Sequence, residues 1–302
     1  MKHPKTILPA LLACAAVVCL IAAGVILFRQ RQSDRHSQET LDELRASAEA
    51  LKGTASSESS NPSAENSELV PEPSQETPLP SAEPTAAPEP APVPIENPYR
   101  DSFLANEDMT AWIQIPGTPV DYPVMWTPED EEYYLLRGFD GKSDNNGCLI
   151  LDTDSCLDPL STNLIIHGHN MKSGAMFGSL TEYEDADFCE EHKSIILYTK
   201  ELQRNYEVIA VFRSQVYKKT DQVFKFYKFF QADTQEEFDD FYQNIKALSI
   251  YDTGVTAEFG DHFLTLSTCV YHVDRGRFVV VAKEVEPGDL YLPIYGEEKT
   301  QH

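Results

Sequence analysis

The chain has 302 residues and a formal net charge of −25 at pH 7, because 49 acidic side chains outnumber 24 basic ones. This balance argues against nucleic acid or anionic lipid as the main partner, since both need basic surface, and it suits an amine-bearing partner better. The six cysteines include no C-x-x-C pair, which argues against a zinc ribbon or a thioredoxin-type redox site. A disulfide between Cys148 and Cys156 is left open.

The N-terminal segment begins with residues 1–5 and continues as an uncharged run over residues 6–28. At about 1.5 Å per residue, this run gives roughly 35 Å of helix, enough to cross a bilayer core. A cleaved signal peptide is the alternative, but its apolar region is usually about 7–15 residues long, and Arg29 and Arg31 follow in place of a cleavage site. We expect a single-pass transmembrane signal anchor in the cell membrane, with a cytoplasmic N-terminus and an extracellular remainder.

Two further segments precede the domain. Over residues 29–52, a Thr-x-x-Glu pattern at 40–43 fits a capping box, and leucines follow at helical spacing, which predicts a short stalk helix. Residues 53–97 contain ten prolines, eight glutamates and no Lys or Arg. Because such a segment buries too little apolar surface to offset its ordering entropy, it predicts a disordered linker.

Residues 98–302 carry the pattern of one folded domain, with 17 basic and 36 acidic residues and a formal charge of −19. Short apolar runs rich in β-branched and aromatic residues predict strands at 112–117, 147–151, 163–167, 194–199, 205–212, 262–268 and 277–284. Most of these runs have no helix between them, which excludes a doubly wound parallel sheet. We therefore expect a mainly β fold, a closed or nearly closed barrel of seven to eight strands with a few peripheral helices.

One segment of the domain has the spacing of an amphipathic helix. A Thr-x-x-Glu capping box at 234–237 precedes four apolar residues at helical spacing, which are Phe238, Phe241, Ile245 and Leu248. These four residues are expected on the buried face of the helix.

Cys269 ends a predicted strand. Strand alternation puts Leu264 and Leu266 on one face and Thr265, Ser267 and Cys269 on the other, so the thiol lies on the more polar face. By residue type alone, an inert core thiol is the commoner interpretation of a cysteine beside an apolar strand. Its neighbours favour a reactive thiol.

The first of these neighbours is Arg277, eight residues downstream at the start of the next apolar run. A hairpin between the two strands would return its guanidinium to Cys269, where a cation lowers the pKa of a thiol. Arg275 competes for this role, and an exposed charge at a strand edge is the alternative for Arg277 itself.

The second neighbour is His169, which directly follows the apolar run 163–167 in a turn that contains Gly168. Catalytic groups are often presented at such strand ends. His167 and His169 could instead form a metal pair, since residues i and i+2 share a strand face, with His262 as a third ligand. No H-E-x-x-H motif or carboxylate-rich cluster accompanies the pair, so we expect no metal and no cofactor.

Together these residues resemble a known family. The run 265–269 (TLSTC) with Arg277 downstream, and the run 168–171 (GHNM) upstream, resemble the active site of the sortases. The run 174–177 (GAMF) makes the pattern most similar to class B. The resemblance covers roughly residues 98–286.

The resemblance implies a cysteine transpeptidase in the cell-wall biology of Gram-positive bacteria. Cys269 would attack the Thr carbonyl of a C-terminal sorting motif similar to LPxTG or NPxTG and form a thioester, with His169 as general acid and base. Arg277 would bind the substrate or stabilise the oxyanion, two roles that the sequence leaves open. The substrate-binding residues implied are Thr268, Ser267 and Asn170.

The partners implied are surface proteins with a C-terminal sorting signal and the amine of a peptidoglycan precursor. Three alternatives are kept. A secreted membrane-anchored cysteine protease would pass the acyl group to water, and a pilin-polymerising sortase would pass it to a pilin lysine. An adhesion or scaffold domain would use Cys269 only structurally.

Overall fold

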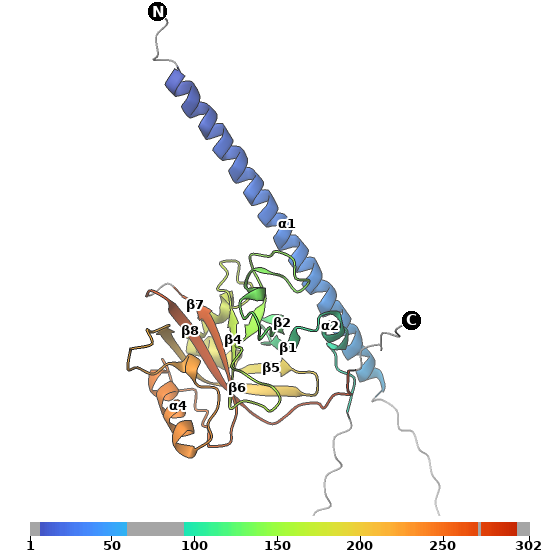
Figure 1. Cartoon of the computed structure of the whole chain (residues 1–302). Helices are drawn as coiled ribbons and strands as arrows, with labels where there is room; N and C mark the ends of the chain where they lie inside the picture. The colour runs from blue at the N-terminus through green and yellow to red at the C-terminus, as the bar shows by residue number, and fades with distance from the viewer. Residues whose placement is uncertain (1–6, 59–93, 271–272, 295–302) are drawn as a thin grey trace, which may run out of the picture.

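The computed structural model describes residues 7–58, 94–270 and 273–294, and Figure 1 shows a β domain with one long helix, α1 (Ile7–Glu58), running along its side and beyond it. Eight strands form a closed barrel in the order β1-β2-β3-β4-β7-β8-β6-β5. Their bounds are β1 Met109–Gln114, β2 Asp121–Met125, β3 Leu149–Leu151, β4 Asn163–Gly168, β5 Ser194–Tyr198, β6 Gln203–Gln215, β7 Phe263–Cys269 and β8 Gly276–Glu284. The expected mainly β, closed barrel is confirmed.

One strand of the barrel was not expected from the sequence. β2 contains Pro123, which lies opposite Trp112 of β1, and β2 also pairs in parallel with the three-residue β3. Proline cannot donate to a strand ladder and therefore lowers the strand signal of a segment. The neighbouring residues compensate, because Tyr122, Val124 and Met125 are buried.

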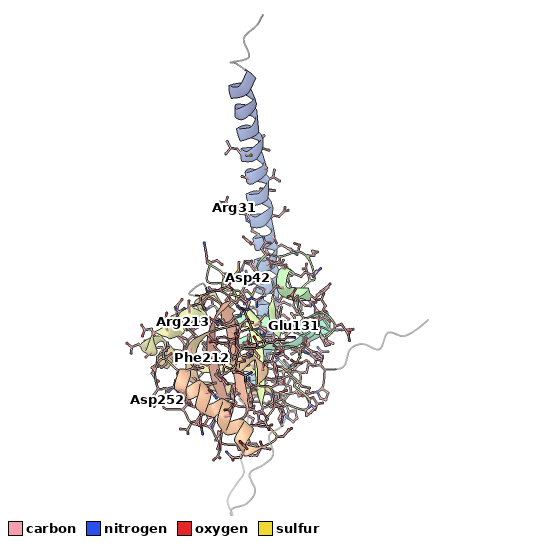
Figure 2. All side chains as sticks on the ribbon, turned by 60° about the vertical axis from the view of Figure 1, so that its left-hand side comes forward. Arg31, Asp42, Glu131, Phe212, Arg213 and Asp252 are labelled. Carbon is pink, nitrogen blue, oxygen red and sulfur yellow. The ribbon has the colours of Figure 1, made fainter. Side chains whose placement is uncertain are left out.

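Successive side chains of the strands point to opposite faces, as the alternation rule requires. On β7, Leu264 and Leu266 belong to the main core inside the barrel, whereas Phe263 belongs to a second core on the outer face. The same alternation holds on β6, where Phe212 is fully buried and Arg213 pairs at the surface with Glu184 at 2.8 and 2.7 Å. Figure 2 labels Phe212 and Arg213.

The outer core is covered by α4 (Gln235–Leu248), which begins at Thr234 with the expected capping box. Phe238, Phe241 and Ile245 are at most 1% exposed, but Leu248 is 43% exposed. Leu248 was therefore wrongly placed on the buried face, because it is the last residue of the helix, where the chain turns away. The remaining short elements are α2 Arg100–Ala105, η2 Tyr133–Leu136, η3 Gly178–Glu184, α3 Ala186–Glu191 and η4 Phe226–Lys228.

The lower half of α1 packs on the barrel. Leu41 is buried against the main core, and Ala48 is buried in a separate cluster that includes Tyr99. Arg45 donates to the Asp121 carbonyl at 2.6 Å and pairs with its carboxylate at 3.2 Å. Thr40 lies inside the helix and donates to the His36 carbonyl at 3.0 Å. The sequence predicted that a helix begins at a Thr40 capping box, and this prediction is wrong because Thr40 lies within α1.

The N-terminal prediction requires correction. Within the part of the chain that the structure describes, no helix combines the length and apolar character needed to cross a bilayer. The predicted single-pass membrane anchor over residues 6–28, and the localisation based on it, are therefore wrong. The described part of the uncharged run belongs to α1, which continues to Glu58.

Other predicted segments fall largely on residues that are not described. The cytoplasmic segment 1–5 and most of the linker 53–97, from residue 59 to 93, lie outside the described residues. Residues 53–58, assigned to the linker, and residues 29–52, assigned to a stalk helix, all lie in α1.

Candidate active site

The candidate site is centred on Cys269, the last residue of β7. Cys269 is partly exposed and lies opposite Arg277 at the end of the antiparallel pair formed with β8. Side chains directly opposite in such a pair share a face and have Cβ atoms about 4.5–5.5 Å apart. The sheet register therefore brings the guanidinium to the thiol side of the hairpin.

Backbone carbonyls hold one nitrogen of the Arg277 guanidinium. Its Nη1 donates to the Gly276 carbonyl at 3.1 Å and to the Arg275 carbonyl at 3.4 Å. A guanidinium has five N–H donors in a planar fork, so the other nitrogens stay available for an anion.

The parallel pair β4–β7 brings the histidine segment to the same end of the barrel. Gly168 pairs with Thr268, and the Thr268 hydroxyl donates to the Gly168 carbonyl at 2.8 Å. The next residue after Gly168 is His169, and the next after Thr268 is Cys269. The Asn170 side-chain amide donates to the Cys269 carbonyl at 2.9 Å, so the turn after β4 is fastened to the end of β7.

The close packing around residue 168 explains why it is glycine. A Cβ added there would lie 2.5 Å from a Leu149 side-chain carbon and 2.6 Å from one of Phe177. Both neighbours belong to the barrel core. Glycine therefore lets β4 end against this core while the next residue, His169, reaches the surface.

The His169 ring is held through Nε2, which lies 2.8 Å from the Leu135 carbonyl. A carbonyl only accepts, so Nε2 carries the hydrogen and Nδ1 is the nitrogen left for proton exchange in the neutral ring. In the described part of the chain, this ring and the Cys269 thiol are not hydrogen-bonded to each other. Such a direct contact is not required before substrate binds.

Ser267 lies two residues before Cys269 on the same face of β7. Its side chain is buried, and its Oγ has no hydrogen-bond partner among the residues that the structure describes. A buried hydroxyl without a partner is costly and needs an explanation. Ser267 is 1% exposed, so this hydroxyl lies beneath the surface of the site.

The other cysteines of the domain differ from Cys269. Cys148 and Cys156 are both free, so the disulfide that the sequence left open is not formed. Burial, and then the nearby Asp144 carboxylate, raise the pKa of the Cys148 thiol. Burial also raises the pKa of Cys189. Because the thiolate is the reactive form, these two buried thiols are poor nucleophiles.

The structure does not gather the histidine metal set considered from the sequence. His167 Nε2 lies 3.1 Å from an Asp152 carboxylate oxygen, while His169 turns to a backbone carbonyl. His262 lies at the far end of the sheet, with Nδ1 3.0 Å from the Ser161 carbonyl.

One component of the site could not be found by sequence reasoning. The acceptor for His169 is a backbone oxygen of Leu135, 34 residues earlier in η2. Every residue has such an oxygen, so no residue type marks it. Only the folded position of η2 identifies it.

A closed barrel that presents a cysteine, an arginine and a histidine at neighbouring strand ends has the arrangement of a cysteine acyl-transfer enzyme. The Sortase domain family model matches residues 113–285. The chain therefore belongs to the sortase family, whose members are cysteine transpeptidases, and it is most similar to class B.

Three relatives illustrate the similarity. Sortase B of Listeria monocytogenes is 34% identical over 193 residues, which cover 63% of this chain and 75% of the relative. The Staphylococcus aureus sortase B–substrate complex is 26% identical with a TM-score of 0.57, covering 64% of this chain and 87% of that chain. A sortase B complexed with triglycine has the same identity, TM-score and coverage.

Proposed function

We propose that Cys269, His169 and Arg277 carry out transpeptidation in this sortase, with Cys269 as the nucleophile. The observation that carries the assignment is the register pairing of Cys269 with Arg277, reinforced by the Asn170 hydrogen bond to the Cys269 carbonyl. The thiolate is the form of a cysteine that attacks a carbonyl.

In the first half of the reaction, the Cys269 sulfur attacks the carbonyl carbon of a threonine in the sorting motif. A carbon–sulfur bond forms, the carbonyl oxygen becomes an oxyanion, and the carbon–nitrogen bond to the following glycine then breaks. The departing amine takes a proton from the His169 imidazolium, since general-acid catalysis assists a poor leaving group. The products are a thioester on Cys269 and the released C-terminal tail.

In the second half, an amine resolves the thioester. His169, now neutral, accepts a proton from the attacking amine, the nitrogen bonds to the acyl carbon, and the sulfur leaves as thiolate. The result is a new amide and a regenerated Cys269. Holding the ring at Nε2 through Leu135 leaves Nδ1 for both proton transfers.

The role we assign to Arg277 is stabilisation of the oxyanion. Its Nη1 is already engaged by two backbone carbonyls, which fixes the orientation of the planar fork. The remaining N–H groups suit a developing negative charge. This geometry supports oxyanion binding over general attraction of substrate.

The substrate we propose is a surface protein with a C-terminal sorting motif similar to LPxTG or NPxTG, and the acceptor is a peptidoglycan-precursor amine. The relatives solved with substrate and with triglycine support both halves of this proposal. We propose that Ser267, on the same face of β7 as Cys269, helps to shape the binding site for the motif. We also propose that Thr268 and Asn170 contribute to the binding site for the motif. Their side chains hold the ends of β4 and β7 together.

Product analysis tests this proposal. The full chain is incubated with a labelled sorting peptide, with and without triglycine as the amine probe, and the products are separated by mass. We expect the peptide–triglycine adduct to replace the hydrolysed peptide as triglycine is raised. Hydrolysed peptide alone at every triglycine concentration would contradict transpeptidation and indicate a cysteine protease.

A further inference from the structure

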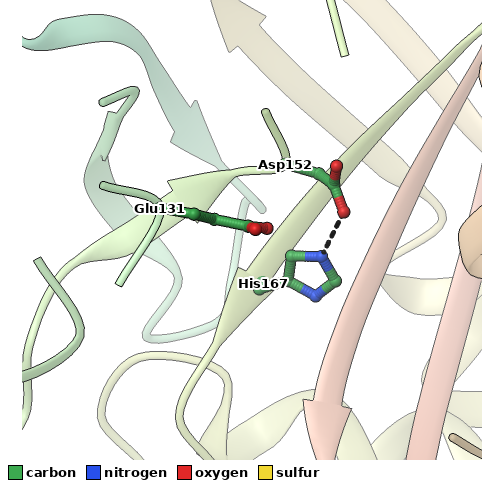
Figure 3. Close-up of side chains that lie close together, drawn as sticks. All are labelled: Glu131, Asp152 and His167. Carbon is green, nitrogen blue, oxygen red and sulfur yellow. Dashed lines mark hydrogen bonds and ion pairs between the residues drawn. The ribbon is translucent and has the colours of Figure 1, made fainter. Parts of the chain in front are cut away.

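A second group of polar side chains lies outside the catalytic set. Glu131, Asp152 and His167 each bring one oxygen or nitrogen within 4.8 Å of the others. Figure 3 shows the three side chains lying close together, and they come from the turn before η2, the residue after β3 and the end of β4. None of the three has a role in the reaction described above.

Two of these side chains are held by the sheet. The Asp152 N–H donates to the Ile165 carbonyl at 2.9 Å. One Asp152 carboxylate oxygen accepts the Asp154 N–H at 3.0 Å, which leaves the other oxygen facing His167. His167 itself pairs with Ile150 on one side of β4 and with Ser267 on the other. Ligands oriented by such secondary contacts are typical of metal sites.

The charges of the group do not cancel. Glu131 and Asp152 bring two carboxylates against one imidazole, and the Asp154 carboxylate follows in the same turn as Asp152. The amine of Lys228 lies 4.0 Å from the Asp154 carboxylate. A single imidazole cannot neutralise two carboxylates, so a divalent cation would relieve their repulsion.

The group is also accessible to an ion. The side chain of Asp152 is 14% exposed and that of His167 is 32% exposed, while Glu131 lies at the surface. The centre is therefore shielded from bulk water on the sheet side and open on the side of the turn.

We propose that Glu131, Asp152 and His167 bind one divalent transition-metal ion of the Zn²⁺ type. One nitrogen and two carboxylate oxygens match the ligands of zinc, with a fourth position for water. Calcium prefers about six to eight oxygen ligands and fits this set poorly. The sequence-based expectation of no metal did not consider this group, because its three members lie far apart in the sequence.

The distances agree with this assignment. Zinc bonds of about 2.0–2.2 Å in a tetrahedron place two ligand atoms roughly 3.3 Å apart. The His167 nitrogen and Asp152 oxygen are 3.1 Å apart, so this pair needs little change. The Glu131 oxygen completes the set, since all three ligand atoms lie within 4.8 Å of one another.

The ion would join the η2 turn to the barrel. Glu131 lies shortly before η2, and Leu135 within η2 accepts the hydrogen bond from His169. A metal bound between Glu131 and the other two side chains would therefore fix the segment that orients the His169 ring. In this role Glu131 is a positioning residue.

Isothermal titration of the full chain with ZnCl₂ tests the site, in a Cys269→Ala background that removes the exposed active-site thiol. We expect one ion per chain. We expect weaker Zn²⁺ binding in each of the ligand variants Glu131→Gln, Asp152→Asn and His167→Gln. Loss of an outer-shell partner lowers metal affinity roughly tenfold to hundredfold, and loss of a direct ligand should lower it by at least as much. Glu129→Gln, in the same turn but outside the group, is the matched control and should bind normally.

Thermal unfolding supplies a second measurement that does not depend on activity. Zn²⁺ should raise the Tm of the parent and of Glu129→Gln, but not that of Glu131→Gln. CaCl₂ at the same concentration should have no such effect. Absence of Zn²⁺ binding, or binding that survives all three ligand substitutions, would overturn the proposal and leave His167 and Asp152 as an ordinary ion pair.

Discussion

Cys269 and Arg277 lie directly opposite each other at the last register position of the antiparallel pair β7–β8. Strand pairing therefore sets the proximity of the two residues, independently of the conformation of the segment that connects the two strands. The parallel pair β4–β7 sets the position of His169 in the same way, since Gly168 lies beside Thr268. Three strand ends of one barrel thus present the proposed catalytic groups together.

Exchange of Arg277 for lysine tests the oxyanion role. An ammonium lacks the planar donor fork, so Arg277→Lys should lower kcat by about 10²–10³, as loss of one oxyanion donor does. Arg275→Lys is the matched control, because Arg275 contributes only its carbonyl to this contact. Steady-state kinetics with a sorting peptide measure both variants, and equal losses in the two would refute the assignment.

Packing of α4 on the barrel can be tested without touching the site. Phe241 is 1% exposed and stacks on Phe229 with ring centroids 4.0 Å apart. Phe241→Ala should therefore lower the free energy of unfolding by about 3–5 kcal/mol. Leu248→Ala, at a residue 43% exposed, should change it by only about 0.5 kcal/mol. Urea unfolding decides, and similar losses would show that Leu248 is packed after all.

Docking of α1 should depend on acid pH through Asp140. Partial burial acts to raise the pKa of this carboxyl, but hydrogen bonds from Lys142 and His36 outweigh it and lower the pKa from 3.8 to about 2. The ionised carboxylate therefore stabilises the folded state above about pH 4, and this contribution is lost as the pH falls toward 2.

Urea unfolding between pH 4 and pH 2 measures this contribution. Asp140→Asn should lose less stability across that interval than the parent chain, because it has no carboxylate to protonate. Lys142→Ala removes the ammonium that lies 2.7 Å from the carboxylate but keeps the backbone N–H bond to it, so it should reduce the pH dependence in the same direction. If the free energy of unfolding changed with pH equally in all three proteins, the lowered pKa of Asp140 would be contradicted.

Much of the barrel and the site could be predicted because they follow from local patterns. Alternation along residues 263–269 placed Cys269 on the face opposite Leu264 and Leu266, and the structure buries these two leucines in the core of the barrel. The hairpin from Cys269 to Arg277 needs only antiparallel pairing of adjacent runs. Such features depend on residues close in sequence.

The features that were missed depend on tertiary context. β2 escaped notice because Pro123 weakens the strand signal, although burial on both sides secures the strand. Leu248 has the spacing of a buried residue but lies at the end of α4. The Leu135 carbonyl and the group of Glu131, Asp152 and His167 join residues far apart in the chain, and no local pattern marks them.

The central claim is that Cys269 carries the acyl group. Intact-mass spectrometry of the full chain, quenched in acid after incubation with a sorting peptide and no amine, detects this intermediate directly. We predict a mass increase equal to the acyl fragment in the parent and in Cys156→Ala, a partly exposed thiol outside the site, and none in Cys269→Ala. An acyl adduct that persists in Cys269→Ala would contradict the account.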